Sequence, residues 1–179
     1  MLKQLKYFRK DLHRMVGKKK FRLLYVWLGR VFWGLYMYRI ERGFYELGGK
    51  YYEAFRILLL PFINLMQAYT NIEIHYKADI GPGISVLHPA LGVVISGHAV
   101  VGSDLTMTGG NVIGIQGKCK PNELLIGSHC KMGANAVIIG PLQLANYINI
   151  GASACVIKDC LEERCSLVGV PAKMIKVYN

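Results

Sequence analysis

The sequence predicts a parallel β-solenoid of triangular cross-section that follows a basic, aromatic-rich helical segment. The first observation is an apolar residue at every sixth position from Ile126 to Val156. The second is that the residue four positions after each of these is also apolar. The third is a change of charge along the chain. Residues 1–70 carry 14 Lys and Arg against 4 Asp and Glu, whereas residues 71–179 carry 8 against 7.

Residues 1–70 are expected to be helical and not to span a membrane. The stretch 21–40 is long and apolar, but Arg30 lies at its centre. A central Arg costs about 2.5–3.5 kcal/mol on insertion scales. We predict that this stretch forms a helix that is either buried or lies at a bilayer surface. A second apolar run, 54–69, is too short to span and is broken by Pro61.

Two roles are open for residues 1–70. Their helices could pack on the rest of the protein, with the basic faces in water. Alternatively, their Lys, Arg, Trp and Tyr side chains could hold the protein on an anionic membrane surface, where each basic residue contributes about 1 kcal/mol. No nucleic-acid partner is expected, because no binding motif accompanies the basic residues.

Cysteine usage indicates a reducing compartment and no metal site. The five cysteines are Cys119, Cys130, Cys155, Cys160 and Cys165. The sequence starts without the short apolar run and small-residue cleavage site of a secretory signal, so a cytoplasmic location is expected. The spacing of the last three cysteines matches no zinc pattern, and Cys160 falls on an inward position of the repeat.

From residue 71 onward the six-residue step recurs in three series. The first two are Ile74, Ile80 and Val86, and then Ile95, Val101, Met107 and Ile113. Each hexad supplies one short strand and one corner, so three hexads make a coil of 18 residues whose equivalent residues stack in parallel. Glycine often follows the inward residue, which permits tight corners. A loop at 114–125 separates the second series from the third, and a C-terminal tail completes the domain 71–179.

These residues carry a resemblance to a known family. The hexads, the stretch "IEIHYKADIGPGISVLHPALGVVISGHAVVG" and the ending "LVGVPAKMI" are similar to the hexapeptide-repeat acyltransferases, within them to the serine acetyltransferase branch. The resemblance covers about residues 71–177 and implies a left-handed parallel β-helix. It also implies a homotrimer with sites between subunits and direct transfer from acetyl-CoA. The whole chain looks closer still to enzymes that O-acetylate exopolysaccharide, such as colanic-acid acetyltransferases.

The resemblance places the catalytic pair at His88 and Glu73. Acetyl transfer to an alcohol needs a base for the hydroxyl proton, a group that orients this base and donors that stabilise the oxyanion. An imidazole suits the first task because its ordinary pKa of about 6.5 lies near working pH. Glu73 stands where the serine acetyltransferases have Asp, close to one coil before His88. The alternative is that His88 is a turn residue and Glu73 a solvated charge.

The other histidines are not expected to perform the transfer. His75 lies two residues from Glu73 and is expected to cap a corner, with support of the catalytic pair as the alternative. His98 and His129 are expected at corners or on the surface. A three-histidine metal site between subunits would need a different spacing, so no metal is expected.

The resemblance also implies a groove for the pantetheine arm of CoA. Backbone amides beside small residues would line it, at Gly114, Ala134, Ala152 and Ser153. Lys173, in "GVPAK", would meet the CoA phosphates, and Lys158 is a second candidate. Tight corner geometry alone would explain the same Gly and Ala residues.

The acceptor is predicted from departures from the serine acetyltransferase pattern. That branch has an Asp directly before the base and an Arg-His pair in the loop, both of which contact serine. Here these positions hold Leu87 and about Asn122 and Glu123. The two charges of an amino acid would have few partners, so we expect a saccharide hydroxyl as acceptor, in capsule or exopolysaccharide biosynthesis on the inner face of the membrane. Serine O-acetylation for cysteine synthesis is the alternative, and a non-catalytic membrane-bound scaffold is a third hypothesis.

Overall fold

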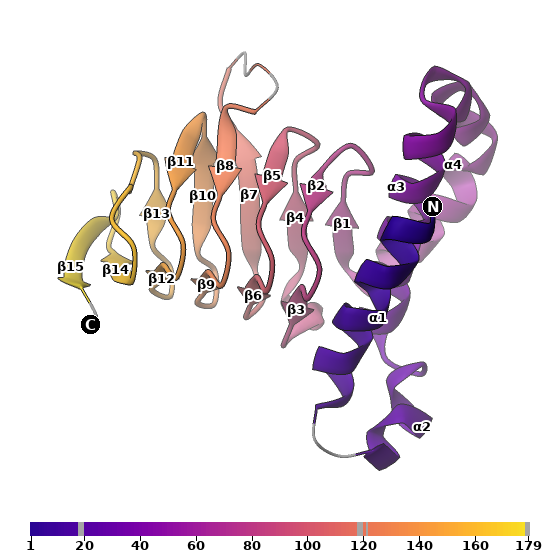
Figure 1. The fold of residues 1–179 in the computed structure, drawn as a ribbon, viewed down its shortest axis with the longest axis horizontal. Coiled ribbons are helices and arrows are strands. Elements are labelled where there is room, and N and C mark those ends of the chain that lie inside the picture. The colour runs from indigo at the N-terminus through magenta and orange to yellow at the C-terminus, as the bar shows by residue number, and fades with distance from the viewer. Residues whose placement is uncertain (18–19, 118–119, 121, 178–179) are drawn as a thin grey trace.

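The chain folds into a parallel β-solenoid with a helical segment across one end, as a computed structural model shows (Figure 1). The structure describes residues 1–17, 20–117, 120 and 122–177. The helical segment consists of α1 (Leu2–Val16), the 3-10 helix η1 (Lys20–Arg22), α2 (Leu23–Val26), α3 (Arg30–Gly48) and α4 (Lys50–Thr70). The predicted fold class, a mainly β parallel solenoid with an N-terminal helical segment, is confirmed.

Three sheets form the three sides of the solenoid. The first sheet contains β1 (Ile72–Ile74), β4 (Val93–Ile95), β7 (Asn111–Ile115), β10 (Val137–Gly140) and β13 (Cys155–Val156). The second contains β2 (Asp79–Ile80), β5 (Ala99–Val101), β8 (Leu124–Ile126) and β11 (Leu142–Leu144). The third contains β3 (Ser85–Val86), β6 (Thr106–Met107), β9 (Lys131–Met132), β12 (Asn149–Ile150), β14 (Cys165–Val168) and β15 (Lys173–Val177). All pairs are parallel except β14 with β15, which form an antiparallel end to the stack.

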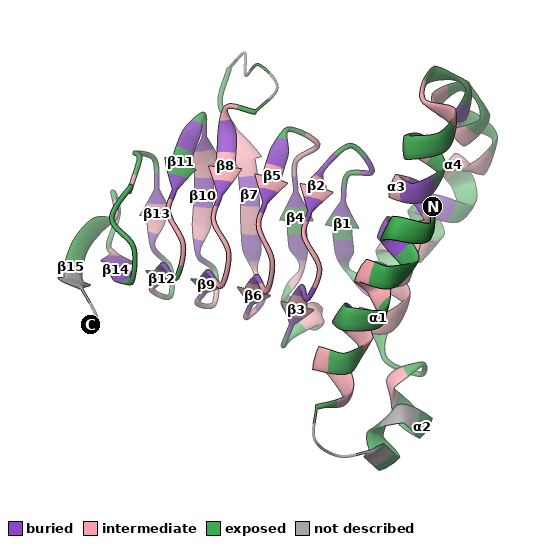
Figure 2. Ribbon diagram, in the orientation of Figure 1, coloured by how far each residue is buried: buried purple, intermediate pink, exposed green. Residues whose placement is uncertain are grey.

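The strand register explains the six-residue period of the sequence. In the first sheet, one aliphatic residue from each coil pairs directly with that of the next, in the order Ile74, Ile95, Ile113, Ile138 and Val156. All five side chains are buried on the axis of the solenoid (Figure 2). Burial of each such side chain contributes about 1.5–3 kcal/mol. The short 3-10 helix η2 (Pro89–Leu91) lies at a corner between the first two coils.

The stretch 21–40 does not form the single helix predicted from its composition. It is divided into the end of η1, α2 and the first part of α3. The break precedes Gly29, which is the N-cap of α3 and has extended backbone angles, φ −80° and ψ 141°. Glycine loses more backbone freedom in a helix than any other residue, so an interruption there is favoured.

The prediction that Pro61 breaks the second apolar run is also wrong. Pro61 lies inside α4, which continues on both sides of it. The ring removes the helical partner of the Ile57 carbonyl. Both residues are exposed, so water can bond that carbonyl. None of the helices in the described part of the chain is long and apolar enough to cross a bilayer.

A buried arginine joins the helical segment to the first coil. Arg39 of α3 is almost fully buried, and its Nε lies 2.8 Å from Oδ2 of Asp11 on α1. Its guanidinium also donates to the backbone carbonyls of Ile80 (2.6 Å) and Gly81 (2.8 Å). Asp11 in turn accepts a hydrogen bond from the backbone amide of Gly83 (2.6 Å). Burial raises the pKa of the Asp11 carboxyl, although Arg39 and the backbone amides oppose that shift.

We expect Asp11→Ala to destabilise the protein by about 3–5 kcal/mol, because it leaves the Arg39 charge buried and unpaired. Urea unfolding followed by circular dichroism measures this change. The matched control is Lys10→Ala at the neighbouring position, where Lys10 forms an exposed ion pair with Asp104 at 3.5 Å. Exposed pairs contribute about 0–1 kcal/mol. Equal losses of unfolding free energy in the two variants would show that the Asp11 carboxylate does not stabilise the buried charge of Arg39.

Candidate active site

The two predicted catalytic residues lie at neighbouring places on the first coils. Glu73 is at the middle of β1, where its exposed side chain lies on the outer face of the first sheet between buried Ile72 and Ile74. His88 follows β3 at the edge where the third sheet turns into the first, and it is exposed. The side-chain amide of Asn71 donates to the carbonyl of Ala90 (2.9 Å) and ties this turn to the coil of Glu73.

In the single chain, no hydrogen bond or ion pair joins Glu73 to His88 among the residues that the structure describes. A hollow of about 250 Å³ lies between β1 and the turn after His88, lined in part by Asn71, Glu73 and Gly92. Glu73 lines this hollow, whereas His88 is not among the residues that line it. Their roles as base and orienting group remain predictions.

The edge that holds His88 also holds three of the six residues predicted to bind CoA. The turns 88–92, 108–110, 133–136 and 151–154 all connect the third sheet to the first, one above the other. Backbone hydrogen bonds between successive turns run from His88 N to Thr108 O (2.8 Å), from Asn135 N to Gly109 O (2.9 Å) and from Ser153 N to Ala134 O (2.8 Å). The structure thus places His88, Ala134, Ala152 and Ser153 on one continuous edge.

Small residues keep this edge narrow. A Cβ at Gly133 would lie 2.6 Å from the backbone nitrogen of Ala152, so only glycine fits between these turns. Ala152 and Ser153 are exposed, and Ala134 is half-buried. The short side chains leave the backbone accessible to an extended ligand.

The other three predicted CoA residues lie elsewhere. Gly114 is in β7, on the outer face of the first sheet. Lys158 follows β13 at the edge between the first and second sheets, and Lys173 begins β15. Both lysines are exposed. A single chain therefore does not place Gly114, Lys158 and Lys173 beside the edge that holds Ala134 and Ser153.

A larger hollow of about 760 Å³ covers the outer face of the first sheet beyond Glu73. It is lined by Arg42 from α3, by Glu73, His75, Lys77 and Asp79 from the first coil, and by His98 and Asn122 further along. Arg42 lies 3.5 Å from Asp79, and Lys77 lies 2.6 Å from Glu53. The hollow therefore contains charges of both signs. The sequence around Arg42 does not predict that its side chain lines this hollow, because α3 reaches the hollow only by folding back over β1.

His75 is a neutral imidazole within this hollow. Burial lowers its pKa, and the nearby charges of Arg56 and Lys77 lower it further. Its Nδ1 accepts a hydrogen bond from the backbone amide of Lys77 (3.1 Å), and its ring stacks on Tyr76 with centroids 4.4 Å apart. His75 thus occupies a corner, where it accepts a hydrogen bond from the backbone.

His98 and His129, and the cysteines Cys160 and Cys165, lie away from the edge of His88. His98 is exposed, and the half-buried His129 stacks on Tyr147 with centroids 4.7 Å apart. The sulfurs of Cys160 and Cys165 are 3.3 Å apart in the last coil, and burial raises the pKa of the Cys165 thiol to about 12. Cys119 falls outside the described residues. Within the described ranges, no group of three or more His, Cys, Asp or Glu side chains could hold a metal ion.

The chain is similar in sequence to curated serine acetyltransferases. It is 36% identical to the Helicobacter pylori (strain J99) enzyme over 112 residues, which are 62% of this chain and 64% of that protein. It is 32% identical to the Synechococcus elongatus enzyme over 113 residues, which are 63% of this chain and 46% of that protein. The chain spans about half the length of the curated relatives it matches. No family model matches it.

Solved structures of serine acetyltransferases share the fold over nearly the whole chain. The Neisseria gonorrhoeae enzyme aligns with a TM-score of 0.80 at 26% identity, over 98% of this chain and 67% of that chain. The same enzyme has been solved in complex with serine, with a TM-score of 0.79, 25% identity, and coverage of 98% and 70%. The chain has the hexapeptide-repeat acyltransferase fold.

The predicted saccharide acceptor is wrong in the light of these comparisons. The relatives and the structural neighbours are serine acetyltransferases, not exopolysaccharide O-acetyltransferases. The prediction rested on the missing serine contacts at Leu87, Asn122 and Glu123. The lack of these three local contacts does not exclude serine as the acceptor.

We expect the imidazole of His75 to titrate below its ordinary pKa of about 6.5. The unfolded chain binds this proton more tightly than the folded protein does, so the lowered pKa stabilises the fold above pH 6.5. This stabilisation is lost as the pH falls below 6.5 toward the folded-state pKa. NMR titration of the histidine ring signals measures the midpoint, and His75→Gln identifies the signal. A midpoint at or above 6.5 would contradict the lowered pKa of this imidazole.

Proposed function

We propose that the chain transfers the acetyl group of acetyl-CoA to the hydroxyl of serine. The observation that carries the proposal is the common edge of His88, Ala134, Ala152 and Ser153, which places the candidate base in line with small residues whose backbone is accessible. The similarity to serine acetyltransferases supports the choice of serine. A structural neighbour of the same fold, 22% identical with a TM-score of 0.76 over 97% of this chain and 70% of its own, has been solved in complex with CoA.

In the proposed mechanism His88 is the general base. The serine oxygen attacks the thioester carbonyl carbon while the imidazole takes the hydroxyl proton. Glu73 holds the second ring nitrogen and stabilises the imidazolium that forms. The tetrahedral intermediate then expels the CoA sulfur, which receives the proton from His88. The products are O-acetylserine and CoA thiol.

The pantetheine arm is proposed to lie along the Ala134–Ser153 edge, with backbone amides as its hydrogen-bond partners. Gly114 would let it approach the first sheet, and Lys158 and Lys173 would meet the phosphates. In the single chain, Glu73 and His88 are both exposed. A homotrimer with sites between subunits would enclose them, which would exclude water and strengthen their electrostatic interactions.

A cytoplasmic location belongs to the same proposal, because acetyl-CoA is an intracellular donor. Peripheral association of residues 1–70 with the inner face of the membrane remains a prediction.

We expect His88→Ala to lower the rate of acetyl transfer at least about 100-fold, the usual contribution of a general base. Release of CoA thiol from acetyl-CoA in the presence of serine measures the rate. His129→Ala, at the corner between the second and third sheets, is the matched control and should retain wild-type activity. Normal turnover by His88→Ala would rule out the mechanism.

We expect Leu87→Asp to lower the KM for serine about three- to tenfold, because it places a carboxylate beside the base for the serine ammonium. The KM for acetyl-CoA should not change. Leu87 and Leu91 are equally exposed, at 55%, on either side of His88. Leu91→Asp is therefore a control for added charge. An equal effect of both substitutions would indicate general electrostatic attraction instead of a specific contact.

A further inference from the structure

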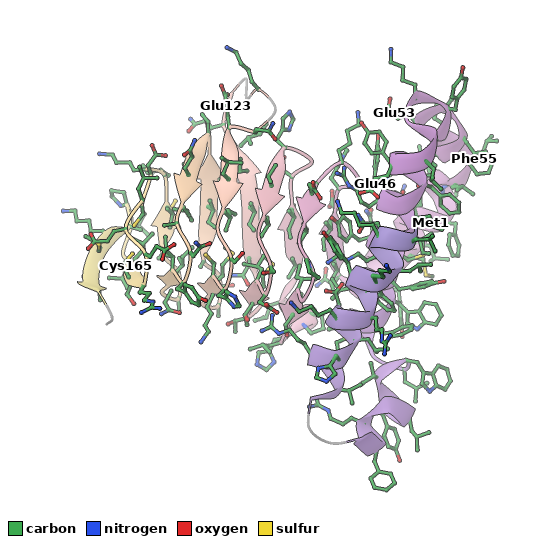
Figure 3. The ribbon with its side chains drawn as sticks, viewed as in Figure 1. Met1, Glu46, Glu53, Phe55, Glu123 and Cys165 are labelled. Atoms are coloured by element: carbon green, nitrogen blue, oxygen red, sulfur yellow. The ribbon has the colours of Figure 1, made fainter. Side chains whose placement is uncertain are left out.

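The segment between α1 and α3 exposes large apolar side chains at one extremity of the molecule. We define the α2 tip as residues 21–28, which comprise the end of η1, all of α2 and the turn that follows. α2 lies beyond the edge of the solenoid (Figure 1), and side chains project outward around it (Figure 3). The exposed apolar residues of the tip are Phe21 (83%), Leu24 (65%), Tyr25 (69%), Trp27 (53%) and Leu28 (56%). Exposed apolar side chains at this density indicate an interaction site.

A hollow of about 340 Å³ separates the α2 tip from the third sheet. Arg22, Tyr25 and Val26 line it on the side of the tip, and Ser85 and Leu87 line it on the side of the solenoid. The tip therefore does not pack tightly against β3. No residue that the structure describes covers its apolar side chains, which remain available to a surface outside the chain.

The charge of this part of the chain suits an anionic surface. Residues 18–30 contain five Lys and Arg and no Asp or Glu. Arg22 is exposed and has no hydrogen bond or ion pair with the described residues. Arg30, also exposed, has its guanidinium 5.9 Å from the ring centroid of Tyr69. Segments that lie on lipid combine aromatic, aliphatic and basic side chains in this way, and Trp and Tyr favour the level of the headgroups.

The basic residues of α1 are less available to a lipid surface than those of the tip. Three of the five Lys and Arg side chains of α1 form ion pairs within the chain. Lys3 lies 3.8 Å from Glu46 of α3, beside the start of α1 (Figure 3). Lys10 and Arg14 lie 3.5 Å and 3.8 Å from Asp104 of the solenoid. Most of the positive charge of α1 thus holds the parts of the chain together.

A second copy of the chain is the other occupant that an exposed apolar segment could have. Two α2 tips carry charge of the same sign, so direct contact between them would bring like charges together. The solenoid offers no compensating excess of acid, because residues 71–179 carry 8 Lys and Arg against 7 Asp and Glu. The balance of charge therefore favours an anionic lipid surface over another copy.

We propose that the α2 tip docks on the anionic headgroups of a phospholipid bilayer, with its apolar side chains at headgroup level and its cations beside the phosphates. This narrows the membrane role predicted for residues 1–70 to eight of them. The tip lies on the bilayer without spanning it, since α2 has only four residues. Leu87 lines the hollow behind the tip and directly precedes His88, so docking holds the edge of His88 near the bilayer.

Flotation of the full chain with lipid vesicles tests the docking. We expect the wild type to float with vesicles of phosphatidylglycerol and phosphatidylcholine, but not with phosphatidylcholine alone, and to detach as added salt screens the charges. Leu24→Glu, which places an anion in the tip, should lower the partition coefficient at least about tenfold. The matched control is Leu161→Glu in the last coil, because Leu161 is 71% exposed against 65% at Leu24. This control should bind as the wild type does.

Tryptophan fluorescence identifies the part of the chain that meets the lipid. The sequence has two tryptophans, Trp27 in the tip and Trp33 in α3. In Trp33→Phe, the emission of Trp27 should move to shorter wavelength when phosphatidylglycerol vesicles are added, because the indole leaves bulk water. In Trp27→Phe, the emission of Trp33 should stay unchanged.

A wild-type chain that does not float with anionic vesicles would overturn the proposal. So would equal losses of binding in Leu24→Glu and Leu161→Glu, or an unshifted Trp27 emission in the bound protein. Light scattering without vesicles tests the other occupant, since a lower mass for Leu24→Glu than for the wild type would assign the tip to a contact between copies. The docking does not depend on the proposed transfer to serine, which thiol release measures separately.

Discussion

The stacking of one aliphatic side chain per hexad along the solenoid axis is the constraint on which the rest of the structure depends. Ile74, Ile95, Ile113, Ile138 and Val156 are paired in register through five coils. A shift of one residue in any strand would turn its apolar residue into water, so burial fixes the register. Because the register is fixed, the turns between the sheets also stack. The edge that carries His88 and the Ala134–Ser153 groove is therefore a consequence of the core.

A parallel solenoid leaves unpaired backbone groups at both ends, and this chain covers each end differently. At the C-terminal end, β15 turns back and pairs antiparallel with β14. At the N-terminal end, α3 and α4 pack on β1, and Arg39 donates to the carbonyls of Ile80 and Gly81 in the first coil. These contacts protect a strand edge that would otherwise recruit another chain. The helical segment is thus an integral part of the fold.

The site shows where single-sequence reasoning succeeds and where it fails. The positions of His88 and the small residues of the groove follow from the repeat and the family resemblance, because equivalent positions of successive hexads must stack. The acceptor did not follow, because the missing local contacts at Leu87, Asn122 and Glu123 were taken to exclude serine, whereas the relatives of the chain are serine acetyltransferases. Arg42 on α3 and Lys77 in the first coil meet in one hollow only after the helices fold over β1.

The sequence by itself determined the solenoid, its inward residues and the helical character of the first seventy residues, since periodic burial is a local property that the chain repeats many times. Only the tertiary structure decided where the helices break and how they dock. Gly29 interrupts an apolar run while Pro61 does not, because the outcome depends on what surrounds each backbone group. The burial of Arg39 was likewise decided by packing between distant segments, which a periodic pattern does not record.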